Sequence, residues 1–168
     1  NGTGISTAAI IFGGDAGSIS ADTETWNGTS WTEVNNLNTA RNQNAGVGTL
    51  PSALCIGGGN PVAVVNVESW NGTSWSETST DLNTAKKYVV GTGTVTACIA
   101  LGRPATTEQF NGSSWTEIAE TNVEHGSGNG SGIVTDALVW GGDNPGYKTD
   151  TEAWNGSAWT EVNNLATA

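Results

Sequence analysis

The sequence predicts an all-β domain built from four copies of one four-stranded unit. Three observations carry this prediction: a six-residue motif that recurs four times, short apolar runs bounded by glycine, and the lack of a helical period. The chain has 168 residues, the size of one ordinary domain, and contains 24 Gly and 8 Trp. Regularly placed Trp, together with Val, Ile and Leu runs, indicates a packed core and not a disordered chain.

The recurring motif sets the length of the unit. It occurs as WNGTSW at 26–31 and 70–75, as FNGSSW at 110–115 and as WNGSAW at 154–159. The first aromatic residues of the four motifs are 44, 40 and 44 residues apart along the 168-residue chain. Four units of this length therefore fill the sequence.

Each unit contains four predicted strands, described here from the innermost to the outermost. The first carries a G-x-G pattern, at 2–4, 46–48, 91–93 and 130–132. The second is an apolar run that ends at a glycine, such as Ala-Ala-Ile-Ile-Phe before Gly13. The third ends in the first aromatic residue of the motif, and the fourth begins near the second. Short apolar runs bounded by Gly fit strands that are buried on both faces.

The Asn-Gly pair between the two aromatics predicts a hairpin, because both residues tolerate the positive φ of a type I′ turn. Side chains alternate with a period of two, so the aromatics share one face whether the loop has two residues or four. Exposed indoles can stack on sugars, but each buried ring removes roughly 150 to 250 Å² from water. We therefore predict that the seven hairpin Trp and Trp140 lie in the core.

Four-stranded units of this period are typical blades of a β-propeller. The succession of Leu-Asn-Thr-Ala-Arg at 37–41, G-x-G, the run into Gly57-Gly58, Trp70 and Trp75 resembles the Kelch repeat. That repeat has a basic residue, a strand, a double Gly, a Tyr and a Trp. The resemblance covers the whole chain, with Trp or Phe in place of Tyr and Gly102-Arg103 in place of one Gly pair. The motif is also similar to a W-N-G-[TS]-S-W variant found in tandem in marine bacteriophage and bacterial surface proteins.

The predicted domain spans residues 1–168 as a closed, Kelch-like propeller of four blades, each of four antiparallel strands. We call the segment that precedes an inner strand, such as Leu-Asn-Thr-Ala-Arg at 37–41, the lead-in of that strand. The N-terminal inner strand of the domain would meet residues 165–168, which match this lead-in. Glycine in every inner strand suits a crowded axis, since only Gly permits such close backbone approach. Two alternatives stay open: a fragment of a longer array, and two chains sharing one eight-bladed ring. A monomer is favoured over a homodimer.

The composition bounds the partners. Five Lys plus Arg against 16 Asp plus Glu give a net charge of −11, which argues against nucleic acid and anionic membrane surfaces. No apolar run is long enough for a membrane helix, so membrane insertion is not expected. We expect Cys55 and Cys98 to be free, buried thiols, which leaves the redox compartment open.

Eight acidic residues follow the repeat. Four lie two residues before the first aromatic and four lie two residues after the second: Glu24, Glu68, Glu108 and Glu152, and Glu33, Glu77, Glu117 and Glu161. Paired carboxylates can perform acid/base chemistry, but four equivalent copies argue against a single asymmetric active site. We expect these side chains to be solvated at strand edges.

The connections between blades and the loops from second to third strands should share one face of a propeller, and these segments differ between units. Seven residues on or beside that face are the predicted binding residues: Arg41, Lys86, Arg103, His125, Asp143, Tyr147 and Lys148. Loops on a rigid scaffold are where binding sites usually lie. We expect His125 to be a surface residue.

No enzyme is expected. Some Kelch-like propellers resemble galactose oxidase, whose copper needs two His and Tyr ligands, whereas this chain has one His. A zinc cluster, a serine triad and a phosphate loop lack their residues, so no metal or cofactor is predicted. The expected function is a recognition module for a glycan or protein, extracellular or on a virion. The alternative is a structural or decoration element of a phage particle or surface protein.

Overall fold

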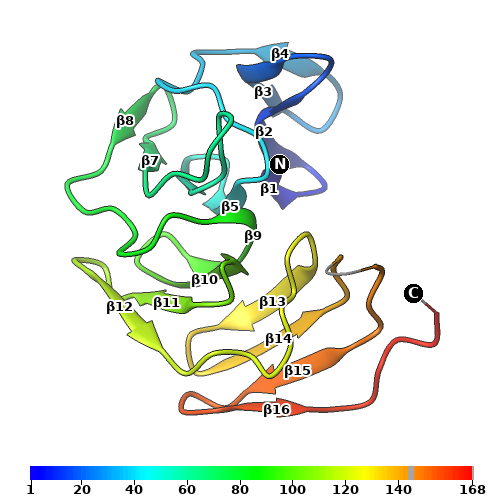
Figure 1. The fold of residues 1–168 in the computed structure, drawn as a ribbon. Helices are drawn as coiled ribbons and strands as arrows, with labels where there is room; N and C mark the ends of the chain where they lie inside the picture. Colours follow the sequence, from blue (N-terminus) through cyan, green and yellow to red (C-terminus); the bar gives the residue numbers. More distant parts are fainter. Residues whose placement is uncertain (144–145, 168) are drawn as a thin grey trace.

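The computed structural model describes residues 1–143 and 146–167, and within them it contains strands and no helix (Figure 1). The strands form four antiparallel sheets, each made of four consecutive strands. Sheets 1 and 2 contain, in order, β1 (Gly2–Ile5), β2 (Ala8–Asp15), β3 (Ile19–Trp26) and β4 (Trp31–Glu33), and then β5 (Ala45–Thr49), β6 (Ser52–Ile56), β7 (Val67–Trp70) and β8 (Trp75–Glu77). Sheet 3 contains β9 (Lys87–Thr94), β10 (Ala97–Arg103), β11 (Thr107–Phe110) and β12 (Trp115–Ile118). Sheet 4 contains β13 (Asn129–Ile133), β14 (Asp136–Trp140), β15 (Thr151–Trp154) and β16 (Trp159–Glu161). The predicted all-β class and its four four-stranded units are confirmed.

The sheets follow one another around an arc, with their first strands on the inside (Figure 1). Strand β1 packs against β5, β5 against β9, and β9 against β13. Among the described residues, β1 and β13 make no comparable contact. The predicted meeting of the N-terminal strand with residues 165–168 and the closure of the ring both stay predictions, and residue 168 lies outside the described residues.

Every motif forms the expected hairpin, but with a four-residue loop in place of a two-residue type I′ turn. Trp26 pairs with Trp31 across the loop, and the other three motifs have the same register. The first residue of the loop is Asn27, whose side-chain oxygen accepts hydrogen bonds from the backbone N–H groups of residues 29 and 30 at 2.9 and 3.0 Å. Only Gly28 has a positive φ, 93°. The Asn side chain thus closes the turn and removes the need for two left-handed residues.

The two aromatics of each motif lie on one face of their sheet, as predicted, with ring centroids 5.1 to 5.5 Å apart. We call this side the front face and the opposite side the back face. In each junction, the front face of one sheet packs against the back face of the sheet before it. At the junction of sheets 1 and 2, for example, the rings of Phe12 and Trp75 meet edge to face with centroids 4.7 Å apart.

Burial of the Trp residues follows these junctions. Five hairpin Trp are buried between sheets: Trp70, Trp75, Trp115, Trp154 and Trp159. The prediction is wrong for Trp31, which is 44% exposed, and only partly met by Trp26 and Trp140, which are half-buried. Those three belong to sheets 1 and 4, at the ends of the arc, where no further sheet of described residues covers them.

Both cysteines are buried and free, in neighbouring junctions. Burial raises the pKa of the Cys55 thiol and that of the Cys98 thiol to about 12.

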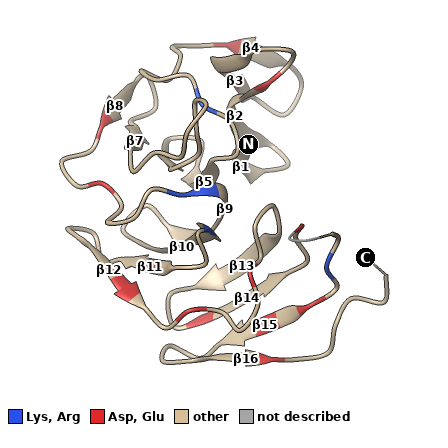
Figure 2. Ribbon diagram, in the orientation of Figure 1, with Lys and Arg blue, Asp and Glu red and all other residues tan. Residues whose placement is uncertain are grey.

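Acidic side chains lie at the outer edge of the sheets. The outermost strands β4, β8, β12 and β16 each carry an exposed acidic residue (Figure 2). Within the described residues, no helix could cross a membrane.

Candidate binding surface

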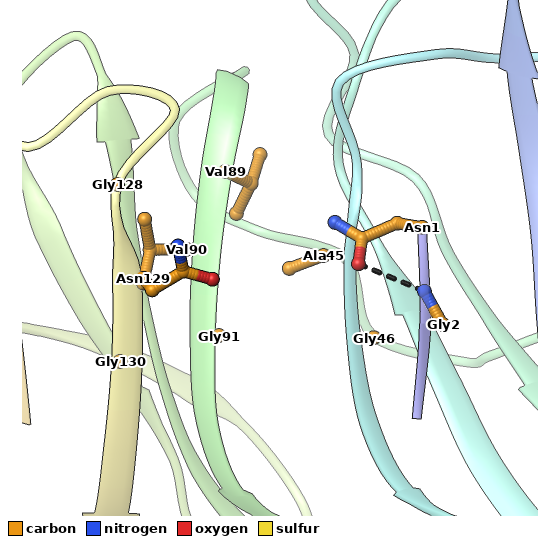
Figure 3. A pocket seen from close by; sticks show the side chains of 10 residues that line it. All are labelled: Asn1, Gly2, Ala45, Gly46, Val89, Val90, Gly91, Gly128, Asn129 and Gly130. Carbon is orange, nitrogen blue, oxygen red and sulfur yellow. Dashed lines mark hydrogen bonds between the residues drawn. The ribbon is translucent and has the colours of Figure 1, made fainter. Parts of the chain in front are cut away.

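The inner strands of all four sheets line two hollows along the axis of the arc. One has a volume of about 150 Å³ and the other of about 360 Å³, and Gly46, Gly91 and Gly130 line both. Figure 3 shows the smaller one, where side chains are few and glycine backbone forms much of the wall. Neither hollow is lined by an acidic, basic or histidine side chain among the described residues.

Three of the seven predicted binding residues are inaccessible. Arg41, Lys86 and His125 are fully buried, each between two sheets. The prediction that they present a surface to a ligand is wrong, as is the expectation of a surface histidine. A side chain without solvent access can contact a partner only if the sheets separate.

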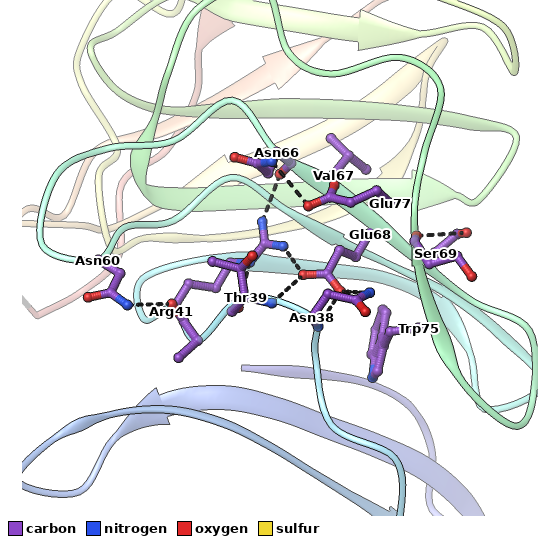
Figure 4. Close-up of polar contacts among 12 residues, drawn as sticks. Asn38, Thr39, Arg41, Asn60, Asn66, Val67, Glu68, Ser69, Trp75 and Glu77 are labelled. Carbon is purple, nitrogen blue, oxygen red and sulfur yellow. Dashed lines mark hydrogen bonds and ion pairs between the residues drawn. The ribbon is translucent and has the colours of Figure 1, made fainter.

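Arg41 pairs instead with Glu68 of the next sheet (Figure 4). Its Nη1 also donates to the carbonyl oxygen of Asn66 at 2.9 Å. The Glu68 carboxylate accepts further hydrogen bonds from the backbone and side-chain N–H groups of Asn38, both at 2.8 Å, and from the N–H of Thr39 at 3.3 Å. These donors surround the carboxylate, which offsets the cost of burying its charge.

The same arrangement recurs at the next junction. Glu108 accepts from the backbone and side chain of Asn83 at 2.7 and 2.9 Å, from the N–H of Thr84 at 3.1 Å, and from Lys86 Nζ at 3.1 Å. Burial lowers the pKa of Lys86, and the neighbouring Glu108 carboxylate opposes that shift. The lead-in and the next carboxylate therefore repeat as one unit.

His125 takes the place of the cation at the third junction. Its Nε2 lies 3.1 Å from Glu152 Oε1 and its Nδ1 lies 2.8 Å from the carbonyl oxygen of Gly141. Both ring nitrogens therefore face oxygen atoms, one of the Glu152 carboxylate and one of the Gly141 backbone. Glu152 also accepts from Asn122, through its backbone at 2.8 Å and its side chain at 2.7 Å.

These three buried pairs correct a further expectation. Glu68, Glu108 and Glu152 are fully buried and are not solvated at strand edges, whereas the four acidic residues after the second aromatic are exposed. Both partners were visible in the sequence: a lead-in that ends in Arg, Lys or His, and a Glu two residues before each first aromatic. Their recurrence in successive repeats, 27, 22 and 27 residues apart, was the signal for a pair, and sequence reasoning missed it.

The other four predicted residues lie on one continuous surface of sheets 3 and 4. Arg103 ends β10, and its side chain lies against Gly126. The carbonyl oxygen of Gly126 accepts from the N–H of Asp143 at 2.8 Å, and Asp143 forms an isolated bridge with Tyr147. Tyr147 is 83% exposed and Lys148 is half-buried beside it. Residues 144 and 145 of this loop lie outside the described residues.

Arg103 is held at the edge of this surface by two contacts. Its Nε lies 2.9 Å from Glu124 Oε1, and its guanidinium carbon lies 4.6 Å from the centroid of the Tyr88 ring. The pair is partly exposed, so breaking it should cost less than removing one partner of a buried pair. We call the surface formed by Tyr88, Arg103, Asp143, Tyr147 and Lys148 the loop surface.

Comparison with known proteins adds no function. No protein-family model matches the chain, and no curated protein has a significantly similar sequence. The resemblance to Kelch repeats therefore stays a prediction. No group of three or more His, Cys, Asp or Glu side chains among residues 1–143 and 146–167 is arranged to hold a metal ion.

Proposed function

We propose that this chain is a Kelch-like β-propeller module without catalytic activity, and that its loop surface binds a partner outside the cell or on a virion. Four consecutive four-stranded sheets with adjacent inner strands support the propeller. The repetition of every buried charged group at three junctions supports a structural and not a catalytic role for these groups.

The observation that carries the binding proposal is the exposed Tyr147 beside two side chains of opposite charge. An exposed tyrosine offers a flat apolar ring and a hydroxyl. Asp143 and Lys148 flank it with an acceptor and a donor, and Arg103 adds a planar group nearby. A ring for stacking and polar groups for hydroxyls suit a glycan, which we propose as the ligand; a protein partner is the alternative class.

A glycan array tests this proposal directly. The variant Arg103→Ala, Tyr147→Ala, Lys148→Ala should lose at least about tenfold in affinity for any glycan that the parent binds, because the removed groups are the anchors. The matched control is Val62→Ala, which truncates an apolar side chain of similar high exposure in the β6–β7 loop. Binding that survives the triple change would show that the loop surface is not the site.

A structural or decoration role is the second candidate. It is favoured by the apolar side chains that both ends of the arc expose to solvent, since such patches mark interaction sites. A protein that binds no glycan on the array, and captures no protein through the loop surface, would favour this role.

A further inference from the structure

The two ends of the arc expose faces that are buried everywhere else. The front face of sheet 1 presents Ile11, 40% exposed, and Trp31. Counted from the glycine that ends each apolar run, Ile11 corresponds to Cys55, Ala100 and Val139, which are all fully buried. The front face of sheet 1 thus carries apolar side chains at positions that a neighbouring sheet covers in the other units, and the described residues supply no such sheet for it.

The back face of sheet 4 likewise exposes apolar side chains whose counterparts in the other sheets are buried. Leu138 is 38% exposed, whereas its counterparts Ile10, Leu54 and Ile99 are buried under the following sheet. Leu165, in the last lead-in, is also exposed, although Leu37 and Leu82 at the same position of earlier lead-ins are buried. A front face laid on sheet 4 would cover both leucines.

The three internal junctions show what covers each face. A front-face Trp packs on the back face of the preceding sheet, as Trp75 does on Phe12, and its indole N–H reaches Thr23 Oγ1 at 3.0 Å. The lead-in of that preceding sheet then crosses above the carboxylate of the front face. Any sheet that covers Trp31 in this way must present a back face together with a lead-in.

Glu24 supports the same partner independently of the apolar residues. Its counterparts Glu68, Glu108 and Glu152 each accept two backbone N–H groups of the preceding lead-in. Glu24 is half-buried and has neither such donors nor a cation among the described residues. The N–H groups of residues 166 and 167 occupy the corresponding positions of the last lead-in.

We propose that the front face of sheet 1 binds the back face of sheet 4 of a second copy of this chain, head to tail. Within one molecule these two faces do not cover each other, since β1 and β13 make no comparable contact. A second copy supplies the missing back face and lead-in while the three existing junctions stay unchanged. Head-to-tail contacts give a closed ring where the rotation between copies closes and a filament where it does not, and the arrangement proposed here is a ring of two copies joined by two such contacts. The proposal does not use the loop surface and is independent of the function proposed above.

The mass in solution, measured by sedimentation equilibrium over a wide range of concentration, tests the pairing. We expect a species of twice the chain mass of 17.1 kDa that dissociates on dilution. Ile11→Asp and Leu138→Asp each place a charge in the contact and should raise the dissociation constant at least about tenfold. Val62→Asp, at an exposed apolar residue away from both ends, should leave the mass unchanged.

Mixing the two variants distinguishes head-to-tail pairing from other arrangements. Each variant alone should be monomeric, but the mixture keeps one intact junction and should regain a species of twice the chain mass. Both sites are substantially exposed, so the variants should fold, and Trp31→Ser provides a second front-face variant if Ile11→Asp does not. A chain that is monomeric at every concentration, or a dimer lost with Ile11→Asp but not with Leu138→Asp, would overturn the proposal.

Discussion

Two identical hexapeptides in this protein have different environments. WNGTSW at 26–31 and at 70–75 form the same hairpin, with ring centroids 5.5 and 5.4 Å apart. Their loops are closed by the same hydrogen bonds to Asn27 and Asn71, at 2.9 to 3.0 Å. Yet Trp31 is 44% exposed and Trp75 only 5%. The difference lies in what stands in front of each sheet: sheet 2 faces sheet 1, and sheet 1 faces solvent.

The comparison shows that the repeated motif encodes two separable properties. The turn and the ring pair are local and form in every copy. Burial of the rings, and of the carboxylate two residues before them, requires a preceding sheet with its lead-in. Four of the five predictions that follow compare matched positions in sheets 1 and 2, and the largest effect comes first.

The largest contrast should be the reactivity of a thiol at position 11 compared with that of Cys55. With its pKa raised to about 12, the Cys55 thiol is almost wholly protonated at pH 8. In the variant Ile11→Cys, studied at low protein concentration, the new thiol should be alkylated more than about a thousandfold faster than Cys55. Mass spectrometry of peptides after iodoacetamide treatment measures both rates, and equal rates would show that the front faces of the two sheets are equally covered.

The raised pKa values also predict alkaline instability. A thiol whose pKa is higher in the folded than in the unfolded chain contributes its full stability below the unfolded value, about 8.5, and loses it as pH rises towards the folded value. Cys55→Ala should therefore flatten the fall in the free energy of unfolding between about pH 9 and 11. Urea titrations at several pH values provide the test, with the parent at pH 7 as reference.

Trp75→Ala should destabilise the fold far more than Trp31→Ala. The first change opens a cavity beside Phe12 and removes the hydrogen bond to Thr23, at a cost of about 3 to 5 kcal/mol. The second, measured at low protein concentration where the chain is monomeric, removes an exposed ring and should cost less than about 1 kcal/mol. Urea denaturation followed by far-ultraviolet circular dichroism measures both. Similar costs would mean that sheet 1 has a covering neighbour in solution, which measurements at several concentrations would then identify.

Glu68→Gln should be the next largest effect, with Glu24→Gln as its matched control. The neutral amide leaves Arg41 as an uncompensated buried cation, which should cost about 3 kcal/mol. Glu24 lacks a paired cation among the described residues, so at low protein concentration, where the chain is monomeric, its change should stay within about 0.5 kcal/mol. If Arg41→Met in the Glu68→Gln background restores part of the stability, the loss came from the unpaired charge.

The smallest effect should be the same in both copies. Asn27→Ala and Asn71→Ala each remove the side-chain oxygen that accepts two backbone N–H groups, at about 1 kcal/mol apiece. Because the turn is local, the preceding sheet should not matter. A clear difference between the two free energies of unfolding would contradict the separation of turn and junction.

Much of the architecture could be predicted from the sequence, because it depends on features that repeat in register. The spacing of Trp26, Trp70, Phe110 and Trp154 predicts four units, and the period of two predicts the shared face of each aromatic pair. The turn type could not be predicted, since Asn-Gly suits both a type I′ turn and a loop closed by the Asn side chain.

The candidate binding residues were predicted less well. Arg41, Lys86 and His125 were assigned to the surface because charged residues in connections are usually exposed. Their burial depends on carboxylates about 27, 22 and 27 residues further along the chain, and only the packing of one sheet on the next brings these together. Arg103, Asp143, Tyr147 and Lys148 remain accessible because no sheet packs over their loops.

The sequence by itself determined the repeating unit: the four strands, the hairpin with its aromatic pair, and the glycines of the inner strands. These depend on contacts between residues close along the chain or in fixed alternation. Only the tertiary structure decided which copies are buried, because burial is a property of neighbouring sheets. For that reason the same six letters form a packed junction in sheet 2 and an exposed face in sheet 1.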